Sequence, residues 1–399
     1  MSPQAQSAIE IRTMVEQDRQ RVLALHREAF PFPGYLLDRY RSAPLGNGRV
    51  LVEDGTVQAA LHLMPFRQYF GRRSVMSCGV GGVKVAAEAR QRGYGSRLLS
   101  SVLQELHASG AALSVLYPTG VAPYRKLGYE MAGSYNRFRV SVDKLPRASA
   151  GATLEPWGEG ELGEIDGCYR EFAAGRSGLL DREAAWWTER VLENHGAEIH
   201  RYLARTNGKV TGYVVYEQVP DPAESPYSYA FHCRELVWHD EASARALLSL
   251  FACQGPLGTA LLWPGPPEDP SALLIGDCQI TAAGRTFWMA RVLQLAGALE
   301  NREYPASLNL ALEFELTDPV VRDNNGAFRL EIAHGTAHLL RIASAAARLD
   351  IGALSALYTG WLRPVDAAAT GRLHNAPPGT LEVFEAAFPA AQSWMFDKF

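Results

Sequence analysis

The sequence predicts an α/β (α+β) protein in which mixed sheets with flanking helices precede a further α+β segment, and three observations predict it. Alternation typical of strands and spacing typical of helices follow each other along residues 9–129. Elements of the same kinds recur in a partly similar order over residues 160–263. Three alternating stretches within residues 308–342 are then followed by two helical stretches, an order that suggests an α+β domain.

Length and composition narrow the class of protein. A chain of 399 residues suggests two to three domains, and its hydrophobic content of 47% suffices for sizeable cores. The net charge of −4 gives no positive field that would favour nucleic acid. No stretch of about 18 apolar residues predicts a membrane span, and the first residues lack the basic and apolar regions of a signal peptide.

The cysteines and histidines indicate neither disulfides nor a metal. The five cysteines are scattered without a C-x-x-C pair, which favours reduced, mostly buried thiols in a cytoplasmic protein. His334 and His338 have the H-x-x-x-H spacing, but the glutamate of a zinc protease is missing and Gly335 lies between them. We therefore expect a hairpin at this point and no metal.

The first part of the chain predicts a sheet with flanking helices. Its expected elements are a strand at 9–12, a helix at 15–29, a hairpin around Asp54-Gly55, a long strand ending at Phe70 and a return strand ending at Val85.

Residues 83–99 form the most informative stretch, because they predict a strand, a basic glycine-containing turn and a helix. The first N–H groups of a helix have no intrahelical partner, and the helix dipole adds partial positive charge there. Arg90 and Arg92 add full charges, while Gly93 and Gly95 let the backbone approach a ligand closely. Such a turn can cradle a pyrophosphate, or it can be only a tight connection between a strand and a helix.

The spacing within this turn separates it from two other phosphate-binding loops. A dinucleotide fingerprint requires G-x-G-x-x-G, and a Walker loop requires Gly-Lys-Ser/Thr, neither of which occurs here. The R-x-x-G-x-G spacing of Arg90, Gly93 and Gly95 resembles the acetyl-CoA motif of the GNAT family of N-acetyltransferases. The elements that follow fit this resemblance, since a buried strand at 112–118 precedes a short helix that Pro123 begins and Gly128 ends.

The remainder of the chain predicts two further segments after a linker at 145–158. The second segment has expected helices at 160–174, 181–193 and 241–253 and expected strands at 200–206, 210–218, 228–238 and 261–263. At its strand-to-helix junction stand Asp240 and Glu241, whose carboxylates would repel a pyrophosphate, so we expect no CoA there. The last segment has expected helices at 288–300, 350–361 and 378–389 and expected strands at 308–316, 328–332 and 337–342.

The three-part plan resembles the enhanced intracellular survival (Eis) family of acetyltransferases over essentially the whole chain. The resemblance rests on the motif above, on Tyr124 in Tyr-Arg-Lys-Leu-Gly-Tyr and on the aromatic C-terminus Ser393–Phe399. It implies a GNAT domain at 1–148, a degenerate GNAT-like domain at 149–287 and a domain like sterol carrier protein at 288–399. It also implies a hexamer that acetylates amines, notably aminoglycosides, and hence a role in antibiotic resistance.

The resemblance further implies the roles of individual residues in direct transfer from acetyl-CoA. Tyr124 is the expected general acid, with a phenol pKa near about 10 that suits protonation of a thiolate, and Tyr129 is the expected packing residue. The carboxylate of Phe399 is the base that the resemblance implies, and the apolar residues of the tail favour docking of the C-terminus over fraying. The expected CoA-binding residues are Val83, Lys84, Val85, Arg90, Gln91, Arg92, Gly93, Tyr94, Gly95 and Ser96.

The acceptor stays open at the level of sequence. Candidate residues that line its site are Glu28, Tyr35, Asp38 and Asp397. Lys398 stands where an acidic residue would help to bind a polycation, which argues against an aminoglycoside more than against an amine in general. The alternatives are an acetyltransferase for protein lysines or a biosynthetic amine, and a non-catalytic protein that binds a lipid in its C-terminal domain.

Overall fold

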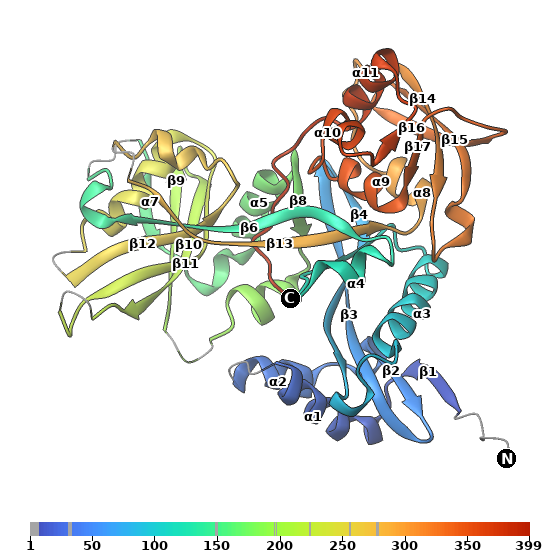
Figure 1. The fold of residues 1–399 in the computed structure, drawn as a ribbon. Helices are drawn as coiled ribbons and strands as arrows, with labels where there is room; N and C mark the ends of the chain where they lie inside the picture. Colours follow the sequence, from blue (N-terminus) through green and yellow to red (C-terminus); the bar gives the residue numbers. More distant parts are fainter. Residues whose placement is uncertain are drawn as a thin grey trace.

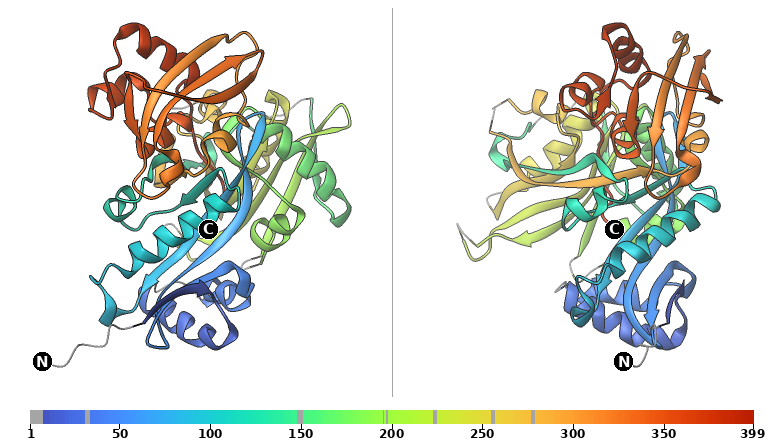
Figure 2. Two further views of the ribbon diagram at one scale, coloured as in Figure 1. Left: turned by 90° about the vertical axis from the view of Figure 1, so that its right-hand side faces the viewer. Right: turned by 45° about the vertical axis from the view of Figure 1, so that its right-hand side comes forward.

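The computed structural model describes residues 8–30, 34–147, 151–194, 196, 198–222, 225–254, 257–276 and 279–399. Figures 1 and 2 show three lobes, with the long strands of the first segment running from the lobe at the N-terminus towards the C-terminal lobe. The elements of the first segment are β1 Ile9–Thr13, α1 Arg19–Ala29, α2 Gly34–Ser42, β2 Gly48–Glu53, β3 Thr56–Gly71, β4 Arg73–Val85, α3 Tyr94–Ala108, β5 Leu113–Leu116, α4 Val121–Arg125 and β6 Glu130–Ser141.

The second segment contains helices and strands, as expected for it. They are β7 Thr153–Pro156, α5 Leu162–Ala173, β8 Arg176–Asp181, α6 Ala184–Trp186, a π-helical turn Trp187–Val191, β9 Ile199–Thr206, β10 Lys209–Pro220, β11 Tyr229–Trp238, α7 Glu241–Ala252 and β12 Gly258–Gly265. The side chain of Asp240 caps α7 by accepting the N–H of Ser243 at 2.7 Å. This carboxylate therefore occupies the helix N-terminus where a phosphate oxygen would otherwise accept.

The last segment packs a smaller sheet against helices. Its elements are β13 Thr281–Val292, α8 Leu295–Leu299, β14 Leu310–Thr317, β15 Gly326–Ala333, β16 Thr336–Ile342, β17 Arg348–Asp350, α9 Ile351–Tyr358, α10 Pro364–Ala369, β18 Leu373–His374 and α11 Pro378–Ala387. The hairpin expected at His334-Gly335 is confirmed, because β15 and β16 pair in antiparallel fashion on either side of it.

The first two segments share one sheet. Within the described residues, thirteen strands join in a sheet ordered β1-β2-β3-β4-β5-β13-β6-β12-β11-β10-β9-β7, with β8 paired to β3, and five strands form the second sheet, β16-β15-β14-β17-β18. Strand β13 lies between β5 and β6, so the last segment begins inside the sheet of the first. The expected domain boundary at 287/288 falls within this strand, and the division into three domains stays a prediction.

The helix expected at 288–300 is wrong, because residues up to Val292 belong to β13 and only Leu295–Leu299 are helical. Trp288, Met289 and Ala290 are fully buried. A strand in the middle of a covered sheet carries a continuous apolar run, which sequence periodicity does not distinguish from a buried helix. The helix expected at 181–193 is also partly wrong, since Asp181 ends β8 and a π-helical turn completes the segment.

Three of the cysteines expected as buried thiols, Cys78, Cys168 and Cys233, are buried and free, Cys253 is free but exposed, and Cys278 lies outside the described residues. None of the helices in the described part of the chain is long and apolar enough to cross a membrane. Within the same ranges, no three His, Cys, Asp or Glu side chains gather closely enough to hold a metal ion.

Candidate active site

A cavity of about 400 Å³ lies between the end of β4, the N-terminus of α3 and the short helix α4. Its position is that of the predicted strand–turn–helix. It is lined by Val83, Val85, Ala89, Arg90, Gln91, Gly93, Tyr94, Gly95, Ser96, Leu99, Pro123, Tyr124 and Leu127.

The backbone at the N-terminus of α3 has features that allow a ligand to approach it closely. Gly93 caps the helix with φ of 78°, in the left-handed region that glycine adopts without a Cβ penalty. A Cβ on Gly95 would lie 3.3 Å from Val85, so the helix can approach β4 closely. No side chain of the described residues caps α3, which leaves its first N–H groups to the cavity. These groups and the exposed Arg90 form an anion site that fits a pyrophosphate.

Two of the predicted CoA-binding residues do not line the cavity. Arg92 forms an ion pair with Glu53 at 2.8 Å, and Tyr94 donates to the same carboxylate at 2.5 Å, so Arg92 braces the start of α3. Lys84 is 2% exposed and donates to the carbonyl of Gly82 at 3.1 Å. Strand alternation explains its position, because Val83 and Val85 face the cavity and the residue between them points to the opposite face.

A β-bulge in β4 adjoins the cavity. The register with β3 shifts between Ala60 and His62, and Gly82 has φ of 55°. A bulge of this kind re-aims the strand beside a site. The pair Gly81-Gly82 is the signal in the sequence that could have indicated it.

Tyr124 lies on α4 in the wall of the cavity. Its ring is half-buried and stands edge-on to Tyr129, with ring centres 6.0 Å apart. Burial raises the pKa of the Tyr124 phenol, so the hydroxyl keeps its proton at neutral pH. Tyr129 is 1% exposed and shares a hydrogen bond of 2.6 Å with Ser114, as expected of a packing residue.

The C-terminal tail is docked in the core. The N–H of Trp394 donates to the carbonyl of Ser177, and that of Met395 to the carbonyl of Ser134. Trp394, Met395 and Phe396 are all less than a tenth exposed. Figure 1 accordingly marks the C-terminus near the middle of the molecule, where the lobes meet. The tail is fixed by these contacts and is not frayed.

Phe399 ends the chain against β4 beside the bulge. Its ring packs against Phe66, at 5.2 Å between ring centres, and against Tyr117 at 5.6 Å. A Cβ on Gly79 would lie 2.7 Å from this ring, and one on Gly81 would lie 3.8 Å from the carboxyl carbon. Gly79 and Gly81 of β4 therefore leave space for the terminal residue, and Gly81 lies two positions before Val83 in the same strand.

Comparison with known proteins fits this geometry. Acetyltransferase (GNAT) domain families match residues 10–132 and 178–292, and the sterol carrier protein domain matches residues 295–396. An uncharacterised N-acetyltransferase of Streptomyces avermitilis is 26% identical over 334 residues, which are 80% of this chain and 81% of the relative. A GCN5-related N-acetyltransferase from Anabaena variabilis, of known structure, is 25% identical, with a TM-score of 0.92 over 98% of this chain and 100% of its own.

The chain is a GNAT-type N-acetyltransferase with an Eis-like fold. The Eis1 protein of Mycobacterium abscessus has the same fold, with a TM-score of 0.79 and 19% identity over 98% of this chain and 100% of its own. The family uses acetyl-CoA as its co-substrate, and the matched range 10–132 contains the whole lining of the cavity.

The candidate acceptor residues of the acetyltransferase are dispersed. Glu28 is exposed on α1, and Asp38 is exposed on α2, where it pairs with Arg41 at 2.7 Å. Tyr35 lies in α2, but its side chain is outside the described residues. Asp397 is buried and accepts from Arg182 at 2.9 Å and from Trp186 at 2.7 Å, which anchors the tail.

A cluster of ionisable and aromatic side chains lies on the buried face of the bulge in β4. The ammonium of Lys84 lies 5.0 Å from the centre of the Tyr40 ring, which itself packs between His26 and His62. Burial lowers the pKa of Lys84 from 10.5 to about 7. Burial and the charge of Lys84 also lower the pKa of His62 to about 3.

Replacing Lys84 by methionine should stabilise the enzyme at pH 7 and have less effect at higher pH. Between pH 7 and 10.5 the unfolded chain binds a proton that the folded chain does not, so the contribution of Lys84 to the free energy of unfolding rises with pH. Urea unfolding of the wild type and of Lys84→Met at pH 7 and pH 9.5 measures this difference. The exposed Lys126→Met is the control, and an equal effect of Lys84→Met at both pH values would contradict the expectation.

Proposed function

We propose that this enzyme transfers the acetyl group of acetyl-CoA to a primary amine by direct attack in a ternary complex. Tyr124 acts as general acid, and the carboxylate of Phe399 acts as base. In this proposal the N–H groups at the start of α3 and Arg90 bind the pyrophosphate, while backbone groups of Val83 and Val85 hold the pantetheine and the thioester carbonyl.

One observation carries the proposal, namely that the terminal carboxyl group and the cavity both lie along β4. Val83 and Val85 line the cavity together with Tyr124, and the carboxyl carbon of Phe399 lies beside Gly81 on the same strand. An acid on one side of the thioester and a base on the other are what amide formation from a thioester requires.

The chemistry then balances with these two groups alone. The amine nitrogen attacks the thioester carbonyl carbon, and the C–N bond forms as the C–S bond breaks. The carboxylate of Phe399 accepts the proton of the amine, directly or through one water, and the hydroxyl of Tyr124 protonates the leaving thiolate. Exchange with solvent returns both groups to their starting states.

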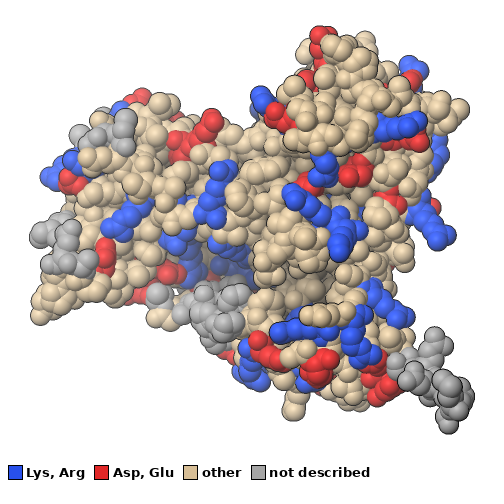
Figure 3. All heavy atoms as spheres, in the orientation of Figure 1, with Lys and Arg blue, Asp and Glu red and all other residues tan. Residues whose placement is uncertain are grey.

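The charges around the C-terminal tail affect which class of acceptor amine is favoured. The ammonium of Lys398 lies 4.1 Å from the centre of the Tyr135 ring. Burial and the charge of Arg137 lower the pKa of Lys398, so these two basic side chains are close enough to interact. Figure 3 shows Lys and Arg side chains along the wall of the hollow in the middle of the molecule. Resemblance to the Eis family favours an aminoglycoside, whereas these charges favour a biosynthetic amine of low positive charge.

Release of CoA thiol with a panel of amines tests the function. The panel holds an aminoglycoside, spermidine, a lysine-containing peptide and a zwitterionic amino acid at one ionic strength. We expect turnover with a primary amine, and a higher kcat/KM for the amines of low positive charge because Lys398 and Arg137 repel polycations. Lys398→Glu should shift this preference towards the aminoglycoside. An absence of amine-dependent thiol release across the panel would contradict the proposed function.

The Eis resemblance also supports proposals about the cellular location, the oligomeric state and the partners of the enzyme. We propose a cytoplasmic homohexamer that acts on a small molecule without nucleic acid or membrane partners. Light scattering of the purified protein tests the hexamer.

A further inference from the structure

The short helix α4 depends on its neighbours for its position. It comprises only Val121–Arg125, and helices of this length are not stable by themselves. Yet Pro123, Tyr124 and Leu127 form one wall of the cavity. Contacts at its C-terminal end therefore hold this wall, and several of them lead to the last segment of the chain.

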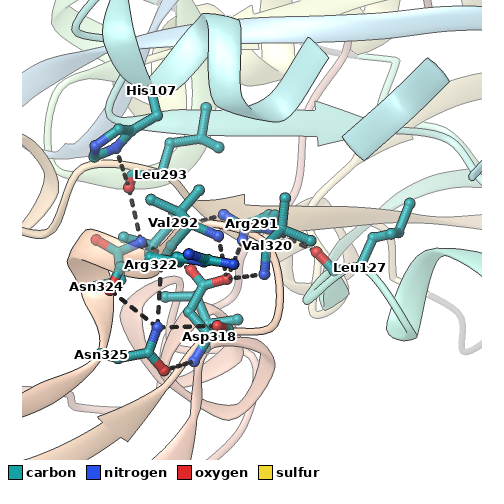
Figure 4. A network of polar contacts seen from close by, with 12 residues as sticks. His107, Leu127, Arg291, Val292, Leu293, Asp318, Val320, Arg322, Asn324 and Asn325 are labelled. Atoms are coloured by element: carbon teal, nitrogen blue, oxygen red, sulfur yellow. Dashed lines mark hydrogen bonds and ion pairs between the residues drawn. The ribbon is translucent and has the colours of Figure 1, made fainter. Parts of the chain in front are cut away.

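A buried ion pair holds the turn that follows α4. The Nε of Arg291 donates to the carbonyl of Leu127 at 2.7 Å, and its Nη2 donates to Asp318 at 2.5 Å. The N–H groups of Val320 and Val321 donate to the same carboxylate at 2.9 Å. Figure 4 shows Arg291 between Leu127 and the loop of Asp318. Both charged side chains are fully buried, so the network joins α4 firmly to the C-terminal lobe.

The same turn packs directly on helix α9. Gly128 has φ of 83°, and a Cβ there would lie 2.5 Å from Ile351 and 3.1 Å from Arg291. Only glycine fits this close approach in the left-handed conformation.

A second bridge reaches α4 through Glu130. Arg125, at the end of α4, donates to this carboxylate at 2.7 Å, and Arg372 of the C-terminal lobe donates to it at 2.7 Å from the other side. Arg372 also donates at 3.2 Å to Asp350, the residue that caps α9. The side chain of Glu130 is 6% exposed, so solvent screens these pairs less than it screens surface pairs.

We propose that the C-terminal lobe holds α4 in its catalytic position, and that Arg372 is a positioning residue for Tyr124. The second part rests on the acid role proposed for Tyr124. The two bridges and the packing of Ile351 fix both the end of the helix and the turn behind it. Arg372 touches neither the cavity nor the reacting groups, and acts through Glu130 and Arg125.

Arg372→Gln tests the proposal better than a change at Arg291, because removal of one partner from a fully buried pair is strongly destabilising. After Arg372→Gln the carboxylate of Glu130 retains Arg125. The matched control is Arg348→Gln, which removes an ion pair of 3.3 Å with Glu315 inside the C-terminal lobe.

Two measurements on the full chain separate the parts of the proposal. Hydrogen exchange of the peptide covering residues 121–128 should be faster in Arg372→Gln and unchanged in Arg348→Gln. With the fastest amine of the panel, kcat should fall about tenfold in Arg372→Gln, since small displacements of a catalytic group are costly, with little change in KM for acetyl-CoA. The loss should vanish when Arg372→Gln is combined with Tyr124→Phe, because the two changes then remove the same contribution.

The outcomes are distinct. Unchanged exchange at 121–128 would overturn the role of the lobe, and an equal loss of kcat with and without Tyr124 would overturn the positioning role. A Tyr124→Phe enzyme with full turnover would instead overturn the acid role, together with the positioning role that rests on it. In that event hydrogen exchange still decides whether the lobe holds α4.

Discussion

Tyr124→Phe should lower kcat by a factor of about 10² to 10⁴, the usual contribution of a general acid, while the affinity for CoA stays the same. The phenol stands in the wall of the cavity, and burial raises its pKa above the ordinary tyrosine value, so it carries a proton at neutral pH. Phenylalanine fills the same volume but has no proton for the leaving thiolate. Steady-state kinetics and calorimetric titration with CoA measure the two quantities.

Tyr129→Phe provides the matched control for this change. Its hydroxyl shares a hydrogen bond with Ser114 away from the cavity, so the loss should appear in stability, by about 1 kcal/mol, and not in kcat. Equal kcat values for Tyr124→Phe and the wild type would refute the acid role. Wild-type kcat should fall only above the usual tyrosine pKa of about 10, and Tyr124→Phe should lack this fall.

Adding one glycine after Phe399 should lower kcat by a similar factor of about 10² to 10⁴ with an unchanged melting temperature. One further residue moves the terminal carboxylate by about 3.5 Å, while the ring of Phe399 can keep its place between Phe66 and Tyr117. The buried residues 393–397 are untouched, so the tail stays docked. Kinetics and thermal unfolding of the extended enzyme measure the effect.

Phe399→Leu is the converse control, because it keeps the carboxylate at the end of the chain and removes the aromatic contacts. We expect a smaller loss of kcat than in the extended enzyme. If the extended enzyme turns over as fast as the wild type, the terminal carboxylate is not the base.

Local patterns in the sequence predicted much of the candidate site. Arg90, Gly93 and Gly95 predicted the turn before α3, whereas the helix expected to begin at Pro123 begins two residues earlier, at Val121, and ends at Arg125 before Gly128. These features depend on neighbouring residues, through backbone conformations that glycine and proline favour. Side-chain partners were harder to predict, because Arg92, in the turn before α3, pairs with Glu53 at the end of β2.

The sequence by itself determined that a strand, a glycine-containing turn and a helix stand at residues 83–99, that Tyr124 follows them and that an apolar tail ends the chain. Only the tertiary structure decided that β13 enters the sheet between β5 and β6, that Lys84 points away from the cavity and that Phe399 ends beside Gly81. The physical reason is that the first set rests on contacts between near neighbours. The second set arises from packing of residues up to about three hundred positions apart, where burial selects the partners and no local pattern records them.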